Sequence, residues 1–439
     1  MSRQRTALIA LSLLLLAAPV IGWGQTRPPI FADFVATNVA QSKAGAREVI
    51  TYRHECLTQW GYEPGTSNRP FVVMGAAKAS PHPPMIVYLH GAGGHAAGYI
   101  FNVPEPSVIG PEFVLLSIDC ADARGPDGWY GWHWARKDPP RYVNVYSPPE
   151  HRCLATIEWV AHKYEIDRNR IYLCGHSMGG SGTLGLGMAR GDIFAALWAG
   201  VPAGVEHAWF RMGFPTNSQV QGWSSNAVAL SAADLKRFSG IGLPDVPPVI
   251  NFSSPIDGWA AGQENLLRAM HDGRHLLVFA WAPFGHTQDY KTANPAVLAY
   301  PWLSIRRDQA YPAFTDASTD RKYPGFKSKG PDQDGQINAY FRWKNVADTA
   351  QEFAMELWLL DGKSLSTPIE VPESSIVDVT PRRLQQFKVA AGKTYGWRLT
   401  EQEKTTQTGE AAADDIGILT IRRLTLRSQP QRLTILAAK

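Results

Sequence analysis

Two patterns of apolar and polar positions follow one another along the chain. From about residue 70 to residue 301, short apolar runs alternate with segments whose apolar residues recur at helical spacing. The strand-like runs are residues 85–89, 113–118, 170–174, 194–199, 249–252 and 276–279, and the helical segments are residues 149–164, 177–190 and 263–271. Strands alternating with helices predict βαβ units on a mostly parallel sheet flanked by helices.

The pattern changes near residue 310. Short runs with period-two alternation follow, separated by turn residues such as Asp361-Gly362 and Ala391-Gly392. These runs are residues 338–343, 352–360, 386–389, 395–399, 417–422 and 432–436. Such spacing predicts a β-sandwich. For a chain of 439 residues we therefore expect an α/β domain over residues 25–309 and a smaller all-β domain over 310–439.

The first 24 residues predict a secretory signal peptide. Arg3 and Arg5 precede an apolar run over residues 7–21, and the small residues Gly22 and Gly24 follow. An uncleaved membrane anchor is the alternative, but the run is shorter than the ~20 residues that span a bilayer. No later segment is apolar for long enough to cross a membrane. We expect an exported chain, secreted or periplasmic, with no transmembrane segment once mature.

Composition and motif spacing limit the classes of partner and cofactor that we expect. Charged residues make up 19% of the chain and the net charge is +4, with no dense Lys/Arg stretch interleaved with aromatics, so no nucleic-acid partner is expected. No Cys-His cluster has metal-ligand spacing, and neither a metal nor a cofactor is expected. The sequence Asp332-Gln333-Asp334-Gly335 has Trp343 where a calcium loop needs its bidentate glutamate, which favours a surface turn. The oligomeric state is not indicated.

The four cysteines are Cys56, Cys120, Cys153 and Cys174. An exported protein can form disulfides, but four cysteines allow three full pairings. Cys120 with Cys153 is the pair we predict, because one ends a strand and the other opens the next helix. Cys174 lies in an apolar strand and fits a buried thiol.

One motif carries nucleophilic chemistry. The strand that ends at Cys174 runs into Gly175-His176-Ser177-Met178-Gly179, a G-x-S-x-G sequence followed by a small-residue helix. In this strand–turn–helix context the motif places a serine on a sharp turn, where bulky neighbours two residues away would collide. Ser177 is therefore the predicted nucleophile.

A second glycine-rich loop supplies candidate oxyanion donors. The run at residues 85–89 ends in His90-Gly91-Ala92-Gly93-Gly94. In this type of site one backbone N–H comes from the residue after the nucleophile, here Met178, and the other from such a loop. Ala92 is the predicted second donor, with Gly93 as the alternative. His90 is interpreted as a structural hydrogen-bonding residue.

The base and its orienting acid should follow the serine in the order acid, then histidine. Asp257 follows the strand at 249–252, and His286 follows the strand at 276–279 and is preceded by glycine. A carboxylate at Asp257 can hold the His286 tautomer that accepts the serine proton. The rivals are Asp245, which precedes its strand, and Asp289, which is too near His286 in sequence; the competing histidines include His176, His271 and His275.

Two inserts flank this machinery. Trp129, Trp132 and Trp134 lie in an aromatic loop between the strands at 113 and 170. They are either a wall for a flat or apolar substrate or anchors that hold a long loop on the body. Residues 206–246 are either a lid over the site or an ordinary surface excursion.

Together these residues resemble a family. The His90-Gly91 loop, the elbow at 175–179, Val201-Pro202-Ala203, Asp257 and Gly285-His286 look like the exported α/β-hydrolase esterases related to polyhydroxybutyrate depolymerases and to feruloyl or acetyl xylan esterases. The resemblance covers about residues 70–287 and implies an ester substrate cleaved by Ser177, Asp257 and His286. The polymer depolymerases commonly have a cysteine in the oxyanion loop, where this chain has Ala92 or Gly93. The tail is similar to accessory fibronectin-like or carbohydrate-binding modules. The expected substrate is either a polysaccharide-linked ester or another small carboxylic ester.

Three functions are compatible with the sequence. The first is a secreted serine esterase, feruloyl or acetyl xylan esterase-like or a related carboxylesterase, which forms an acyl-enzyme on Ser177. The second is a serine peptidase similar to the prolyl oligopeptidase group, which usually carries its extra domain as an N-terminal propeller. The third is a non-catalytic carbohydrate-binding protein.

Overall fold

The computed structural model describes residues 36–437, except residues 61, 63, 67–68, 101–108, 121–128, 130–147, 189, 203–244, 259, 261, 288, 327 and 329–331. Several predictions fall outside the described residues. They are the signal peptide at 1–24, Trp132 and Trp134, and residues 206–244 of the lid predicted at 206–246. Among the described helices, none combines the length and the apolar character that a membrane crossing requires.

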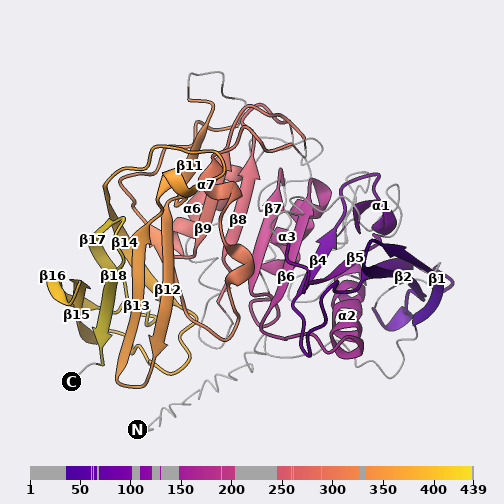
Figure 1. The fold of residues 1–439 in the computed structure, drawn as a ribbon, viewed down its shortest axis with the longest axis horizontal. Coiled ribbons are helices and arrows are strands. Elements are labelled where there is room, and N and C mark those ends of the chain that lie inside the picture. Colours follow the sequence, from indigo (N-terminus) through magenta and orange to yellow (C-terminus); the bar gives the residue numbers. More distant parts are fainter. Residues whose placement is uncertain are drawn as a thin grey trace, which may run out of the picture.

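A ten-stranded sheet organises the larger part of the molecule (Figure 1). Its central strands β4 to β9 pair in parallel, and β1, β2, β3 and β11 add antiparallel strands at the two edges. In spatial order the strands are β1 (Ala36–Ala44), β2 (Arg47–His54), β3 (Arg69–Met74), β5 (Val114–Ile118), β4 (Met85–Leu89), β6 (Ile171–His176), β7 (Ala196–Gly200), β8 (Val249–Ser253), β9 (Leu277–Trp281) and β11 (Gly335–Ile337).

The parallel centre of the sheet confirms the predicted α/β layer. Each of the six apolar runs found in the sequence forms one strand from β4 to β9, and every residue of these strands is buried. Parallel strands are covered on both faces, and therefore they appear as continuous apolar runs rather than alternating ones. Strands β1 and β2 form a hairpin over residues 36–54, which no pattern in the sequence predicted.

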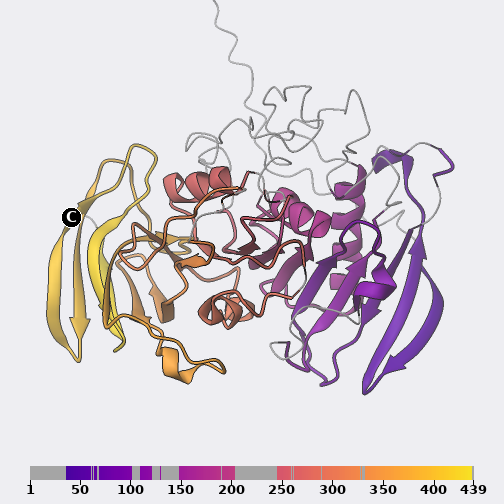
Figure 2. The same ribbon diagram turned by 90° about the horizontal axis from the view of Figure 1, so that it is seen from above.

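Helices cover both faces of the sheet. Residues of α1 (Ala96–Ile100) and α7 (Pro295–Leu298) belong to the apolar cluster on one face. Residues of α2 (Pro148–Lys163), α3 (Met178–Gly187) and α6 (Gln263–Asp272) belong to the cluster on the other. Figure 2 shows α2, α3 and α6 along the same side of the strands. Short 3-10 turns lie at Thr58–Trp60 (η2), Trp302–Ser304 (η3) and Gly362–Ser364 (η4).

The C-terminal part forms two antiparallel sheets, consistent with a second β domain. One contains β10 (Tyr311–Thr315), β14 (Ser374–Arg382) and β17 (Ile421–Arg427). The other contains β12 (Phe341–Asp348), β13 (Glu352–Leu359), β18 (Gln431–Leu436), β15 (Thr394–Glu401) and β16 (Lys404–Ala412). One apolar cluster includes residues of these strands and of the large sheet. Strand β11 belongs to the tail in sequence but pairs with β9 of the large sheet.

One predicted strand is wrong. Residues 386–389 form no strand, because the backbone N–H groups of Gln386 and Phe387 donate to the carboxylate of Asp348 instead of to a neighbouring strand. A side-chain acceptor thus takes the donors that a sheet would have used.

The predicted Cys120–Cys153 disulfide is also wrong. All four cysteines are buried thiols. Cys153 lies within α2, where burial raises the pKa of its thiol to about 12. The backbone N–H of Cys120 donates to Nε2 of His90 at 2.9 Å, and its thiol is close enough to the guanidinium of Arg152 to interact with it electrostatically.

Candidate active site

Ser177 stands on a strained turn between β6 and α3. Its φ of 57° and ψ of −120° lie in a region of backbone conformation that residues other than glycine rarely adopt. The backbone N–H of Ser177 donates to the carbonyl of Gly200 at 2.8 Å, which ties the turn to the end of β7. The Ser177 side chain therefore projects from the carboxyl edge of the parallel strands.

The glycines of the turn are required by close backbone contacts. A Cβ at Gly175 would lie 2.3 Å from the carbonyl oxygen of Gly179, and a Cβ at Gly179 would lie 1.8 Å from the carbonyl oxygen of Leu89. Both contacts are with backbone and cannot be relieved by a side-chain rotation. The motif is therefore a packing requirement in this chain as well as a sequence pattern.

The structure brings Ser177, His286 and Asp257 together in one hydrogen-bonded row. Nε2 of His286 lies 2.7 Å from Oγ of Ser177, and Nδ1 lies 2.8 Å from Oδ2 of Asp257. The Asp257 side chain is 3% exposed and that of His286 is 39% exposed. Since a carboxylate only accepts, Nδ1 carries the proton, which leaves the Nε2 lone pair facing the serine hydroxyl.

The loops after β8 and β9 are joined beside this row. The backbone N–H of Gly285 donates to Oγ of Ser254 at 3.0 Å. Ser254 precedes Asp257 on one loop, and Gly285 precedes His286 on the other. The bond therefore helps to fix the loop that carries the imidazole relative to the loop that carries the carboxylate.

The two predicted sources of oxyanion donors lie side by side. The contacts of Gly179 with the carbonyls of Leu89 and His90 put the first turn of α3, which begins at Met178, directly against the end of β4. The loop continues through Ala92 and Gly93, both exposed, and Gly93 has a φ of 75°. A hydrogen bond from Gly94 N–H to the Gly91 carbonyl at 3.0 Å closes this turn.

His90 holds the loop of residues 90–94 through contacts with backbone groups, as its structural interpretation predicted. Nε2 accepts from the Cys120 N–H, so the ring proton is on Nδ1, which donates to the carbonyl of Gly91 at 2.8 Å. Oδ1 of Asp119 lies 3.1 Å from the same Nε2. The imidazole thus links the loop to the end of β5.

Trp129 is buried between the loop of residues 90–94 and α3 instead of being exposed to solvent. Its side chain is 2% exposed, and its Nε1–H donates to the carbonyl of His90 at 2.8 Å. The indole meets the His90 ring edge-on at 5.1 Å, and a Cβ at Gly182 of α3 would lie 2.4 Å from the Cβ of Trp129. Of the two interpretations of the aromatic insert, the contacts of Trp129 match the anchor.

The rival acid is occupied elsewhere. Asp245 precedes β8 and forms an ion pair with Arg382 of β14, and its carboxylate also accepts the backbone N–H of Arg383. These two contacts lower the pKa of Asp245 against the opposing effect of its burial. Asp245 therefore holds the C-terminal β region to the large sheet.

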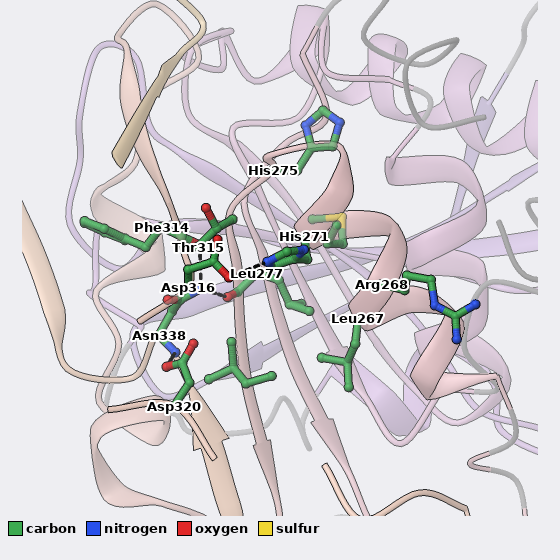
Figure 3. Close-up of a pocket in the computed structure, with 12 residues that line it drawn as sticks. Leu267, Arg268, His271, His275, Leu277, Phe314, Thr315, Asp316, Asp320 and Asn338 are labelled. Atoms are coloured by element: carbon green, nitrogen blue, oxygen red, sulfur yellow. Dashed lines mark hydrogen bonds and ion pairs between the residues drawn. The ribbon is translucent and has the colours of Figure 1, made fainter. Parts of the chain in front are cut away.

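A cavity of about 260 Å³ lies away from Ser177 (Figure 3). It is lined by α6, the first residue of β9 and the C-terminal segments around Phe314, Asp320 and Asn338. None of Ser177, Asp257 and His286 lines it. Among the described residues, no group of three His, Cys, Asp or Glu side chains is placed to hold a metal ion.

Comparison with known proteins gives no family and no curated relative. No family model matches the chain, and no curated protein matches it. Among solved structures, the chain is similar to an S-formylglutathione hydrolase from Agrobacterium tumefaciens, with 16% identity, a TM-score of 0.40 and coverage of 57% of this chain and 93% of that one. An acetyl xylan esterase from Aspergillus awamori matches at 15% identity and a TM-score of 0.37, over 50% of this chain and 77% of that one.

A glucuronoyl esterase from Solibacter usitatus is similar at 11% identity and a TM-score of 0.39, over 57% of this chain and 74% of that one. By name, the first of these neighbours is a hydrolase and the other two are esterases. At such identities and scores the likeness assigns no activity to this chain, and the function has to be argued from its own residues.

Proposed function

We propose that this protein is a serine hydrolase that cleaves carboxylic esters through an acyl-enzyme on Ser177. The observation that carries the proposal is the row of hydrogen bonds at 2.7 and 2.8 Å from Ser177 through His286 to the buried Asp257. The same row ends on a serine held in a strained backbone conformation at the edge of the sheet. Together these features supply a nucleophile, a base and an orienting acid.

The first half of the reaction transfers the acyl group. Oγ of Ser177 attacks the ester carbonyl carbon while its proton moves to Nε2 of His286, and the carbonyl electron pair moves onto oxygen. The backbone N–H groups of Met178 and of Ala92 or Gly93 donate to that oxyanion. When the intermediate collapses, the bond to the alcohol oxygen breaks and the alcohol takes the proton from His286.

The second half returns the enzyme to its starting state. Water attacks the acyl carbon as His286 accepts its proton, and the new intermediate expels Oγ of Ser177, which recovers that proton. Asp257 stays ionised throughout and holds the imidazole in the tautomer with Nδ1 protonated. Ester, water, acid and alcohol balance without any cofactor.

The proposal extends to the whole chain. Residues 25–309 form the catalytic domain, and residues 310–439 form an accessory β domain that directs the enzyme to a polysaccharide-linked ester. The resemblance of residues 70–287 to feruloyl and acetyl xylan esterases supports this substrate class, and the basic and apolar segments of residues 1–24 support export.

A substrate panel tests the proposal. The purified protein should hydrolyse p-nitrophenyl acetate, longer acyl esters, methyl ferulate or acetylated xylan, and Ser177→Ala should abolish this turnover while it leaves the unfolding temperature unchanged. The panel also contains a peptide p-nitroanilide. Cleavage of the anilide alone would replace the esterase by a peptidase, and equal rates for the protein and Ser177→Ala would reject nucleophilic catalysis by this serine.

A further inference from the structure

Tyr290 connects the loop of His286 to the nucleophile turn. It follows His286 by four residues and is buried. Its ring packs against Phe252 of β8 with centroids 5.1 Å apart, and against Trp198 of β7 at 5.5 Å. Phe284, which lies on the other side of His286 in sequence, packs edge-on against the Tyr290 ring at 5.4 Å. The aromatic contacts therefore hold both ends of this loop on the carboxyl ends of the strands.

The Tyr290 hydroxyl reaches the turn itself. It lies 2.6 Å from Nδ1 of His176, the residue directly before Ser177. A Cβ at Gly200 would lie 2.2 Å from the same hydroxyl oxygen. The carbonyl of Gly200 accepts the Ser177 N–H. The Tyr290 hydroxyl therefore lies against two residues that adjoin Ser177, namely His176 in sequence and Gly200 through this hydrogen bond.

His176 is a neutral partner for this bond. Burial, together with the positive charge that His286 can carry, lowers the pKa of His176 to about 4. The two imidazoles have centroids 5.6 Å apart. A neutral His176 can share a hydrogen bond with Tyr290 and still add no positive charge beside the base.

The His286 side chain itself is only partly packed. It is 39% exposed, so contacts of its loop have a large share in setting its direction. The loop is tied before His286 by the Gly285–Ser254 hydrogen bond and after it by Tyr290. An imidazole must be aligned with the serine to within a fraction of an ångström for efficient proton transfer.

We infer that Tyr290 is a positioning residue: its hydrogen bond to His176 holds the His286 loop against the nucleophile turn and so keeps Nε2 of His286 in line with Oγ of Ser177. The inference rests on the function proposed above. It assigns to the first variable residue of the G-x-S-x-G sequence, His176, the role of docking partner for the base loop.

Tyr290→Phe is the direct test, because it removes the hydroxyl and keeps the ring contacts. We expect kcat for the best ester to fall about 10–100-fold with KM changed less than about threefold, since the loss concerns alignment and not substrate binding. Tyr300→Phe is the matched control. Tyr300 is fully buried, and its hydroxyl has no hydrogen-bond partner among the described residues, so kcat should stay within about twofold of wild type.

Variants of His176 show whether the bond is the agent. His176→Asn keeps a polar atom near the position of Nδ1 and should retain most of kcat, whereas His176→Phe should lose as much as Tyr290→Phe. The double variant His176→Phe/Tyr290→Phe should be no slower than either single one, because both remove the same interaction. Additive losses, or kcat for Tyr290→Phe within twofold of wild type, would overturn the inference.

A second measurement does not depend on turnover. The Nδ1 proton that His286 shares with Asp257 should give a downfield proton resonance in wild type and in Tyr300→Phe, and this resonance should broaden or vanish in Tyr290→Phe. If no ester is cleaved by the wild type but the resonance behaves in this way, the proposed function fails and the positioning role stands. If the resonance is the same in all three proteins, the positioning role fails whatever the activity.

Discussion

A histidine with neighbouring carboxylates lies near each end of strand β9, and the two clusters differ in what surrounds the imidazole. At the carboxyl end, Nδ1 of His286 faces Asp257 and Nε2 faces a serine hydroxyl. At the amino end, Nδ1 of His271 lies 3.1 Å from Asp272 and Nε2 lies 3.1 Å from Asp316. Figure 3 shows His271 and Asp316 joined at the wall of the cavity.

The difference decides which imidazole can act as a base. Burial opposes the protonated form of His271, but its hydrogen bonds to Asp272 and Asp316 prevail and raise its pKa. Each of its nitrogens faces a carboxylate, which only accepts, so neither nitrogen faces a group whose proton it could take. His286 has one carboxylate and one hydroxyl, so a single nitrogen keeps its lone pair for Ser177.

The two clusters also differ in solvent exposure. The side chains of His271 and Asp316 are 50% and 63% exposed, whereas that of Asp257 is 3% exposed. Exposed ion pairs contribute ~0–1 kcal/mol, and a buried carboxylate that orients one imidazole is much harder to replace. A histidine–aspartate pair is therefore a candidate for catalysis only where a strained serine and a buried acid accompany it, as they do at the carboxyl end.

The largest effect is expected for the acid of the carboxyl-end cluster. Asp257→Asn should lower kcat by about 10⁴-fold, because an amide no longer fixes the tautomer with the proton on Nδ1. Asp316→Asn makes the same change in the amino-end cluster and should leave kcat within about twofold of wild type. Steady-state kinetics on one ester compare the two; equal losses would remove the distinction between the clusters, and a near-normal rate for Asp257→Asn would show that another group orients His286.

A smaller effect on kcat is expected for Trp129, which is buried against the loop of residues 90–94. Trp129→Phe removes the hydrogen bond to the His90 carbonyl and should lower kcat about tenfold, less than the 10²–10³-fold typical for deletion of an oxyanion donor itself. It should also lower the free energy of unfolding by about 1–3 kcal/mol, because a buried acceptor is left unsatisfied.

Trp281→Phe provides the comparison for that variant. Trp281 is equally buried, and its Nε1–H has no hydrogen-bond partner among the described residues. The variant loses indole packing without losing a hydrogen bond, so it should be destabilised yet nearly fully active. If both variants lose turnover to the same extent, the role of Trp129 is packing alone.

The carboxyl-end cluster could be predicted from the sequence because its signals are local. Ser177 directly follows β6, and Asp257 and His286 lie in the loops that follow β8 and β9, all of which are apolar runs that form parallel strands. Parallel strands of one sheet end at the same edge, so three residues far apart in sequence were expected at one place. The contacts of Gly175 and Gly179 also follow from the motif, since the turn leaves no room for a Cβ.

Other features depend on contacts that no local pattern encodes. Strand β1 is exposed along almost its whole length, so it has no apolar alternation to mark it. Trp129 lies in an aromatic segment whose sequence fits a surface wall equally well, and its burial and its hydrogen bond to His90 match an anchor instead. Tyr290 shows its role through the partners Phe252, Trp198 and His176, which come from three different strands.

The smallest effect on turnover is expected at the amino-end cavity, where a substitution should change only the pH dependence of stability. There Asp320 accepts the backbone N–H of Asn338 at 2.8 Å. Burial raises the pKa of Asp320 to about 7, against the opposing effects of that hydrogen bond and of His271. Between its ordinary pKa of 3.8 and about 7, the folded protein therefore binds more protons at this residue than the unfolded chain does. Stability contributed by this group must fall as pH rises through that window.

Asp320→Asn keeps an acceptor for Asn338 and removes the charge. The variant should match wild type in unfolding free energy near pH 4 and exceed it by on the order of 2 kcal/mol at pH 8, with ester turnover unchanged at both values. Denaturant titrations at several pH values give the difference curve, and taking the difference cancels the opposite contribution of buried neutral histidines such as His275, whose pKa burial lowers to about 3. A flat difference curve would mean that Asp320 is ionised at the cavity wall without cost, and a change in kcat would mean that the two ends of β9 are coupled rather than separate.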